Sequence, residues 1–445
     1  GIRDDLVTGV QTCALPIYAI VRACLATFLA TRELPAFVRD ELHAFLRCGL
    51  PAYGVALFTC TTCKKSRLTA LCCKGRGFCP RCLGRRMTEL AHEWTRFVIP
   101  HVRVRQWVLS LPFALRAALA WHHDLALAVH GVAARAITRW YEKKAEALGI
   151  ELPRTGMLTV IQRSGSDLAL NVHFHMLLLD GVFDVHNQFT VIAAPTHDEM
   201  LALTTTIAER IVRLCQRRAL DDDLPDAERN LCTSLARSAA RRGTTAHRYP
   251  DHDPDHHRDP WAGLIKARVD GFDLECTTVV RADDRDRLEH LCRYVLRPPL
   301  ADRRLRMLDG DQVGIELKRP WRDGTTWVTM STETFLERLC SLVPKDREHT
   351  VLYRGVLAGR ARRRKHVVPT ENGPRPKNIT WAALMKHGLG LDVLACPCGG
   401  TMKFIATVLD KESLARLLPA HGLRVRALPI APARAPPQAE FDFGP

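Results

Sequence analysis

Two closely spaced cysteine pairs constrain the N-terminal part of this chain more than any other feature. Cys60 and Cys63 form the first CxxC pair, and Cys79 and Cys82 form the second after 15 intervening residues. Each pair bends the chain so that both sulfurs face one ion, and two such pairs can supply four thiolates to a tetrahedral zinc. We predict one structural Zn²⁺ held by these four residues; the alternative is a set of free buried thiols. Four-thiolate zinc has no open position, so no chemistry is expected there.

The remaining cysteines carry a weaker signal. The chain has 16 cysteines in 445 residues, a size at which a fold does not need disulfides. Cys72 and Cys73 lie between the two pairs and could replace a ligand, but they are interpreted as secondary. Cys396 and Cys398 form a CxC pattern followed by two glycines, with no second pair after it. We do not predict a metal at that second patch.

The charge balance favours a polyanionic partner. Lys and Arg number 64 against 48 Asp and Glu, which gives a formal net charge of +16. Each phosphate that such a surface neutralises releases condensed counterions, so DNA is the expected partner. A zinc-stiffened module that contacts protein is the alternative for the N-terminal part. The residues expected to bind DNA surround the cysteine pairs or lie on a later helix: Lys64, Arg67, Lys74, Arg76, Arg81, Arg85, Arg86, Arg293 and Arg297.

Composition along the chain predicts an α+β protein of several domains. Residues 1–17 resemble translated sequencing-adapter DNA and are treated as foreign. Residues 18–100 are predicted to form a helical zinc-binding module, and residues 101–345 the main folded domain. Residues 346–430 are a basic region that includes the second cysteine patch, and residues 431–445 are a Pro- and Ala-rich tail expected to be disordered. We see no apolar run of ~20 residues that could span a bilayer.

Hydrophobic periodicity predicts the elements of the main domain. The runs Thr155–Gln162 and Leu168–Leu179 are apolar and are separated by a polar turn, which predicts a hairpin. A further strand is expected over Arg105–Leu111, a long helix over residues 114–147, and a helix over Asp283–Leu296.

A His-x-His motif lies inside the second strand of the predicted hairpin. His173 and His175 are two residues apart, so in a strand both imidazoles project from one face. Two nitrogens at that separation can bind one divalent ion and leave positions for a third ligand and for substrate oxygens. Such an ion polarises a phosphodiester as its bond breaks. The alternative is a buried, hydrogen-bonded histidine pair, which short His-x-His motifs often are.

A tyrosine on the predicted helix is a candidate nucleophile. His290, Tyr294 and Arg297 share one side of that helix by their spacing. A tyrosine hydroxyl can attack a phosphate to form a covalent phosphotyrosine, and neighbouring arginines can grip the DNA backbone. A tyrosine in a basic helix is nevertheless more often a packing residue.

Taken together, these motifs resemble the rolling-circle insertion-sequence transposases of the IS91 type, which belong to the HUH (His-hydrophobic-His) class. The resemblance covers nearly all of residues 20 to 410. It is carried by CCKGRGFCPRCLGRRM (72–87), RQWVLSLPF (105–113), IQRSGSDLALNVHFHMLLLDGVF (161–183) and LEHLCRYVLRPPLADRRL (288–305), in this order.

The resemblance implies a fold, a reaction and a setting. Residues 101–345 would be the HUH catalytic domain, an antiparallel sheet covered by helices with the histidines on a central strand. Mg²⁺ or Mn²⁺ would be held by His173 and His175, and the tyrosine would cut one strand at an element end through a 5′-phosphotyrosine link. Single-stranded or hairpin DNA ends would be the substrate, in the bacterial cytoplasm and in association with the nucleoid.

Two departures from the family pattern matter. Some relatives carry two tyrosines four residues apart, whereas this chain has His290 at the earlier position, which leaves Tyr294 as the expected nucleophile. The third metal ligand of the class is a Gln, Glu or His from elsewhere, and Gln162, Glu289 and His290 are all candidates. The second cysteine patch is also one residue shorter than the family's CxxC.

Three other functions fit parts of the sequence, and the weakest of them is a metal hydrolase, which a stable protein–DNA adduct would rule out. A relaxase or replication initiator would use the same chemistry on a plasmid origin, although the N-terminal cysteine module and the motif order favour a transposase. A zinc-containing DNA-binding regulator without catalysis is the alternative of another class. The oligomeric state, the end sequences and the activity of this copy stay open.

Overall fold

The computed structural model describes residues 16–217, 265–309, 311–318, 320–321, 323–369, 382–383, 386, 392–426 and 429–433. Most of the segment expected to be foreign therefore lies outside the described residues, as does most of the tail expected to be disordered. The last two residues of the first segment are an exception, because Pro16 and Ile17 begin a helix and Ile17 is fully buried.

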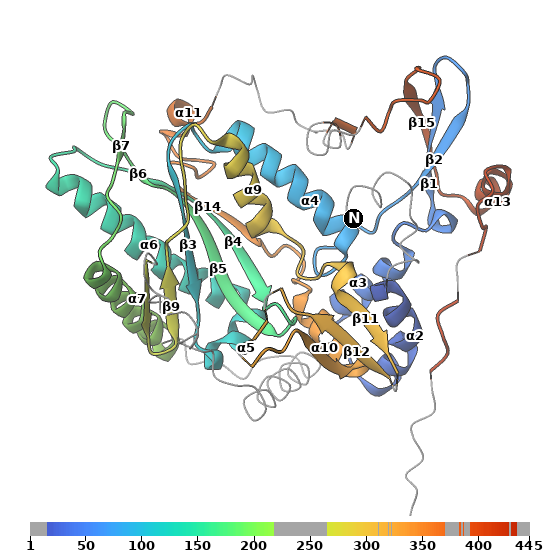
Figure 1. Ribbon diagram of the computed structural model, residues 1–445, viewed down its shortest axis with the longest axis horizontal. Helices are drawn as coiled ribbons and strands as arrows, with labels where there is room; N and C mark the ends of the chain where they lie inside the picture. The colour runs from blue at the N-terminus through green and yellow to red at the C-terminus, as the bar shows by residue number, and fades with distance from the viewer. Residues whose placement is uncertain are drawn as a thin grey trace, which may run out of the picture.

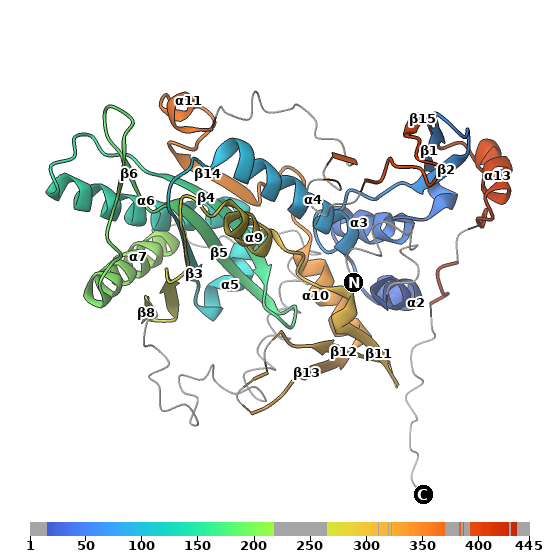
Figure 2. The ribbon, with the colours of Figure 1, turned by 45° about the horizontal axis from the view of Figure 1, so that its top comes forward.

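A seven-stranded antiparallel sheet forms the centre of the α+β fold (Figures 1 and 2). The hairpin predicted from the two apolar runs is present, and its second strand is central in the sheet. The strand order is β14 (Val351–Gly355), β4 (Gly156–Ser164), β5 (Leu170–Leu179), β3 (Val104–Ser110), β9 (Phe272–Glu275) and β8 (Lys266–Val269), with β10 (Val279–Val280) also paired to β3.

The alternation of side chains along β5 gives the sheet two buried faces. Phe174 points to one face and joins the larger hydrophobic core. Leu177 and Leu179 point to the other face and join a second core. Because strand side chains alternate with a period of two, His173 and His175 share the face of Leu177.

Helices cover both faces of the sheet, which gives three layers (Figure 2). The histidine face packs against α4 (Pro80–Glu93), the short π-helix η3 (Trp94–Val98) and α9 (Arg285–Leu296). The opposite face packs against α5 (Phe113–Trp121), α6 (His123–Ala147) and α7 (His197–Arg217). The single helix predicted over residues 114–147 is interrupted at His122, whose φ of −104° and ψ of 86° are not helical.

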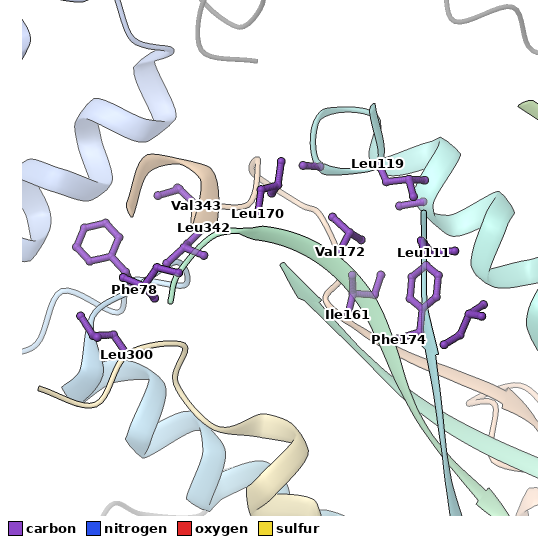
Figure 3. Packing of buried hydrophobic residues seen from close by; sticks show 14 of the residues in the cluster. Phe78, Leu111, Leu119, Ile161, Leu170, Val172, Phe174, Leu300, Leu342 and Val343 are labelled. Atoms are coloured by element: carbon purple, nitrogen blue, oxygen red, sulfur yellow. The ribbon is translucent and has the colours of Figure 1, made fainter. Parts of the chain in front are cut away.

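The N-terminal helices share the core of the sheet. Helices α2 (Pro16–Thr31) and α3 (Ala36–Arg47) pack near α10 (Thr332–Leu342) and the sheet of β11 (Leu305–Leu308), β12 (Gln312–Glu316) and β13 (Trp327–Ser331). Figure 3 shows Phe78 beside Leu342 and Val343, in the same cluster as Phe174. The expected N-terminal module and main domain therefore have one continuous hydrophobic core.

A third sheet joins the two ends of the chain. Strand β1 (Val55–Cys60) lies between β2 (Ser66–Ala70) and β15 (Met402–Val408), and all pairings are antiparallel. Figure 1 shows red β15 beside blue β1, with α13 (Lys411–Ala420) nearby.

The smaller elements are η2 (Pro51–Tyr53), β6 (Gly181–Phe183), β7 (Phe189–Val191), η4 (Asp302–Arg304) and α11 (Arg364–Val367). Among the described helices, none is long and apolar enough to cross a membrane.

Candidate active site

The two histidines of the His-x-His motif lie side by side on β5, on the face that α9 covers. Their ring centroids are 4.9 Å apart. His175 is 5% exposed, whereas His173 is partly buried. Register places Val108 and Val160 on either side of His175, so the neighbouring strands enclose its ring with apolar side chains.

Hydrogen bonds orient both rings. The Nδ1–H of His173 donates to the carbonyl oxygen of Asn171 at 2.8 Å, since a carbonyl can only accept. The Nε2 of His173 therefore keeps its lone pair, which is the donor a metal needs. The side-chain Nε2 of Gln106 on β3 lies 2.8 Å from the Nδ1 of His175 and, as an amide nitrogen, donates to it. With the Gln106 amide flipped, its oxygen would accept from the Nδ1–H of His175, and the Nε2 of His175 would then be available to a metal in the same way.

Gln106 was not predicted from the sequence. It lies opposite Leu177 and therefore diagonally from His175 across the β3–β5 pair. Nothing in the local pattern around residue 106 marks it, because its role depends on which strand pairs with β5 and in which register.

Burial keeps both imidazoles neutral near pH 7. Burial lowers the pKa of His173 to about 4, partly offset by the bond to Asn171, and the charges of Arg116, Arg297 and Lys318 lower it further. Burial also lowers the pKa of His175 well below its ordinary value, followed by the effect of His173. The neutral form is the one that ligates metal, and the surrounding cations create a positive potential that suits a phosphodiester.

Tyr294 lies against this pair. Its ring centroid is 6.0 Å from that of His175, with the ring planes at 89°. The Cζ atom of Arg297 lies 4.2 Å from the centre of the tyrosine ring. Tyr294 is 45% exposed, so it combines contact with the histidine pair and access from solvent.

The local sequence explains the position of this tyrosine. Helix α9 begins after Asp284, whose side chain accepts from the backbone N–H of Arg287, and it ends before two prolines. Its apolar side chains recur at helical spacing and are buried, which holds the helix on the sheet and leaves Tyr294 on the flank. These buried residues are Leu288, Leu291, Cys292 and Val295.

Of the three candidates for a third ligand, Gln162 fits best. It lies directly opposite His173 in the β4–β5 register, on the same face. Its Nε2 donates to the carbonyl oxygen of Val295 at 2.6 Å, which leaves Oε1 for other partners. Glu289 instead pairs with Arg293 at 2.5 Å, and His290 is exposed. Among the described residues, neither Glu289 nor His290 converges with the histidine pair as a metal-ligating group.

A cationic pocket adjoins Gln162. It lies between α4, β4 and the end of α9, and its lining includes Arg76, Arg86, Arg163 and Arg297. Burial lowers the pKa of Arg163, and Arg76 lowers it further, against the opposite effect of Glu348. Burial and Arg76 likewise lower the pKa of Arg86. The effect of Arg76 on both neighbours indicates excess positive charge in this pocket, to which a phosphate is complementary.

Several other residues expected to bind DNA make contacts within the protein. Arg67 donates to the carbonyl oxygens of Val393 and Ala395 at 2.9 and 3.3 Å. Arg85 and Arg293 pair with glutamates one turn away on their own helices. Lys64 donates to the carbonyl oxygen of Thr61, Arg76 to that of Glu348 and Arg81 to that of Ala70. Lys74 has a φ of 57° in the loop that follows Cys73.

The four cysteines expected to share one zinc are divided between two sets. Cys79 and Cys82 converge with Cys48 and Cys73, whereas Cys60 and Cys63 converge with residues near the C-terminus. The grouping predicted from spacing is therefore corrected. Spacing alone could not reveal this division. A CxxC pair shows that two sulfurs face one ion, but it does not show which other sulfurs complete the site.

The first set has the dimensions of a four-thiolate zinc site. Its sulfur–sulfur distances are 3.8 Å for Cys48–Cys82, 3.4 Å for Cys73–Cys82 and 3.7 Å for Cys48–Cys79. A tetrahedron with Zn–S bonds of ~2.3 Å has sulfurs about 3.8 Å apart. Cys73 was interpreted as secondary and Cys48 was not predicted at all, since it follows α3 outside any paired motif.

Two family models match the chain. The model described as "Transposase zinc-binding domain" matches residues 20–111, which include the set of Cys48, Cys73, Cys79 and Cys82. The model described as "Putative transposase" matches residues 156–365, which include His173, His175 and Tyr294. No curated protein and no solved structure matches the chain. The family match and the thiolate geometry together support structural zinc in the N-terminal region.

Proposed function

The chain belongs to the IS91-type transposases, and from this we propose that it nicks and rejoins single-stranded DNA at insertion-sequence ends through a 5′-phosphotyrosine intermediate. The observation that carries the proposal is the contact between Tyr294 and His175. It joins an accessible nucleophile to a neutral imidazole pair on one face of the sheet.

The donor set fits a divalent cation. His173 presents Nε2 and Gln162 has an oxygen available, whereas His175 would present Nε2 once the Gln106 amide is flipped so that its oxygen accepts from Nδ1–H. We propose that these three side chains hold Mg²⁺ or Mn²⁺, for which the Gln162 amide oxygen is a suitable donor, and that the two imidazoles leave further positions for water and substrate oxygens. When bound, such an ion polarises the phosphodiester and offsets the negative charge that develops as the bond breaks.

The chain's own groups then perform the strand transfer. The phenolic oxygen of Tyr294 attacks the phosphorus and loses its proton to solvent, which its exposure permits. The bond from phosphorus to the 3′-oxygen breaks, and that oxygen takes up a proton to become a free 3′-hydroxyl. A 3′-hydroxyl later attacks the phosphotyrosine and restores both the DNA bond and the tyrosine. The number of phosphodiester bonds is conserved, so no ATP is consumed.

The cationic pocket is a candidate path for the DNA strand. Arg86 and Arg297 line it from the zinc-bearing region and from the tyrosine helix. We propose that phosphates next to the cut bind there, which would hold a single strand between α4 and the sheet. Arg67, Arg85 and Arg293 have a smaller part in this proposal, because their guanidiniums already contact protein groups.

A covalent-adduct experiment tests the reaction. Single-stranded DNA from the element's ends, labelled at either terminus, is incubated with protein and Mn²⁺ and separated under denaturing conditions. The 3′-labelled strand is expected to yield a protein–DNA adduct, and the 5′-labelled strand a shorter fragment with a free 3′-hydroxyl. Tyr294→Phe should abolish the adduct while DNA binding is retained.

Tyr53→Phe is the matched control. Tyr53 is 47% exposed and Tyr294 is 45% exposed. The two tyrosines therefore have similar access to solvent but different surroundings. The control should form as much adduct as the wild type. Binding of an end sequence without any adduct in the wild type would contradict the proposal and favour the non-catalytic regulator. Cutting of a plasmid origin in preference to element ends would favour the replication initiator.

A further inference from the structure

Four cysteines from opposite ends of the chain converge at the edge of the third sheet. Cys60 and Cys63 lie at the end of β1, and Cys396 and Cys398 precede β15. The sulfurs of Cys60 and Cys398 are 3.5 Å apart and those of Cys63 and Cys396 are 3.7 Å apart. All four sulfurs lie within 4.8 Å of one another. Both short distances exceed a disulfide bond of ~2.05 Å and approach the ~3.8 Å edge of a tetrahedral zinc–thiolate site.

The backbone around each cysteine pair forms a tight turn. In the first turn the N–H of Cys60 donates to the carbonyl oxygen of Lys65 at 2.9 Å, and Lys64 has a φ of 60°. In the second turn the N–H of Cys396 donates to the carbonyl oxygen of Gly400 at 2.8 Å. The two turns thus present both sulfurs of each pair toward the other pair, even though the second is CxC.

Gly400 is required for this approach. A β-carbon at this position would lie 2.8 Å from the sulfur of Cys60 and 2.5 Å from the hydroxyl oxygen of Thr62. Such a contact is closer than real β-carbons make, so a side chain at this position would push the two turns apart. The adjacent Gly399 has a φ of +83°, which glycine adopts without strain.

The third sheet has little apolar core of its own. Its cluster of buried residues consists of Val55, Leu414 and Leu418. A small sheet with so few buried side chains needs a further constraint to be stable, and a structural metal is a common one. Backbone pairing already aligns the end of β1 with the start of β15, because the N–H of Thr61 donates to the carbonyl oxygen of Thr401 at 2.9 Å.

We propose that Cys60, Cys63, Cys396 and Cys398 bind a second structural Zn²⁺, which ties residues 392–426 to the N-terminal zinc-binding region. Four thiolates in a tetrahedral set select zinc over harder cations. The site shares no sulfur with the first set. Cys396 and Cys398 lie beyond both family matches, which end at residues 111 and 365. The proposal does not depend on the strand-transfer reaction.

Zinc stoichiometry tests the proposal. Full-length wild-type protein is expected to contain two zinc ions per chain, measured by elemental analysis and by release to a chromogenic chelator. The double variant Cys396→Ser/Cys398→Ser should retain one, and so should Cys73→Ser/Cys79→Ser. Cys215→Ser, on α7 and outside both sets, should retain two. One zinc in the wild type, or two in the Cys396/Cys398 double variant, would overturn the proposal.

A second measurement distinguishes the loss of this zinc site from general misfolding of the variant. Hydrogen exchange should accelerate in β1 and β15 of the Cys396→Ser/Cys398→Ser variant, because their pairing loses its metal constraint. Exchange in β4 and β5 should stay as in the wild type. Unchanged exchange at β1 and β15, or faster exchange throughout the chain, would contradict a metal site that links β1 locally to the residues before β15.

Discussion

The ring of Tyr294 stands edge-on to the ring of His175, with centroids 6.0 Å apart. The two residues come from α9 and β5, which lie far apart in the sequence. Their contact depends on the apolar face of α9, which buries Leu291 and Val295 against the sheet. This contact brings the His-x-His motif and the tyrosine of α9 together in one candidate site.

Gln162 provides a test of the metal site. Gln162→Ala should raise the Mn²⁺ concentration needed for half-maximal adduct formation by roughly 10–100-fold, because an oxygen opposite His173 is lost. Gln162→Glu should retain high affinity, since a carboxylate oxygen can replace the amide oxygen. Glu289→Gln is the control and should need no more Mn²⁺ than the wild type. An equal effect of Gln162→Ala and Glu289→Gln would argue against Gln162 as the third ligand.

Arg86 and Arg297 test the proposed DNA path. Removal of either guanidinium should weaken binding to single-stranded DNA and reduce the slope of log affinity against log salt by about 0.7. Arg281→Ala provides the control, because the Arg281 side chain is 79% exposed and pairs with Asp283 away from the pocket. Binding titrations at several salt concentrations measure the slope. A slope that is unchanged in both pocket variants would remove the pocket from the DNA path.

His130 should contribute to loss of stability in acid. It is fully buried against Thr159 on the other face of the sheet, and burial lowers its pKa to about 3. The unfolded chain therefore takes up a proton near pH 6.5 that the folded chain does not, and stability falls as the pH drops from 6.5 toward 3. The slope contributed is about 1.4 kcal/mol per pH unit within that window.

His130→Leu should remove this contribution. Its free energy of unfolding, measured by urea denaturation between about pH 4 and 6, should fall less steeply with decreasing pH than that of the wild type. Thr159→Val removes the hydrogen-bond partner but no titrating group, so it should keep the wild-type slope. Equal slopes for His130→Leu and the wild type would show that His130 is not the group that responds.

Asp180 should be important for stability. It is fully buried and accepts hydrogen bonds from Arg103, Arg105 and Tyr141 at 2.7–3.0 Å. Asp180→Ala leaves Arg105 buried without its counterion and should lower the free energy of unfolding by about 3–5 kcal/mol. Asp283→Ala removes an exposed ion pair and should cost no more than about 1 kcal/mol. Similar losses for the two variants, measured by urea denaturation, would contradict this assignment.

Residues close together in the chain were enough to predict the local parts of the site. A strand places His173 and His175 on one face because its side chains alternate, and the hairpin of β4 and β5 follows from two apolar runs and a turn. The helical spacing of Leu288, Leu291 and Val295 likewise predicts the helix that carries the tyrosine. These features depend on residues close in the chain.

The distant residues that complete each site are selected by the packing of the whole chain. Gln106 reaches His175 because β3 pairs with β5 in one particular register. Cys60 lies beside Cys398 because β15 pairs with β1 from the other end of the chain, whereas spacing predicted that Cys60 and Cys63 share one zinc with Cys79 and Cys82. A short motif specifies how its own sulfurs or imidazoles point, because that depends on local backbone geometry. It does not specify the partners, because those depend on how the whole chain packs.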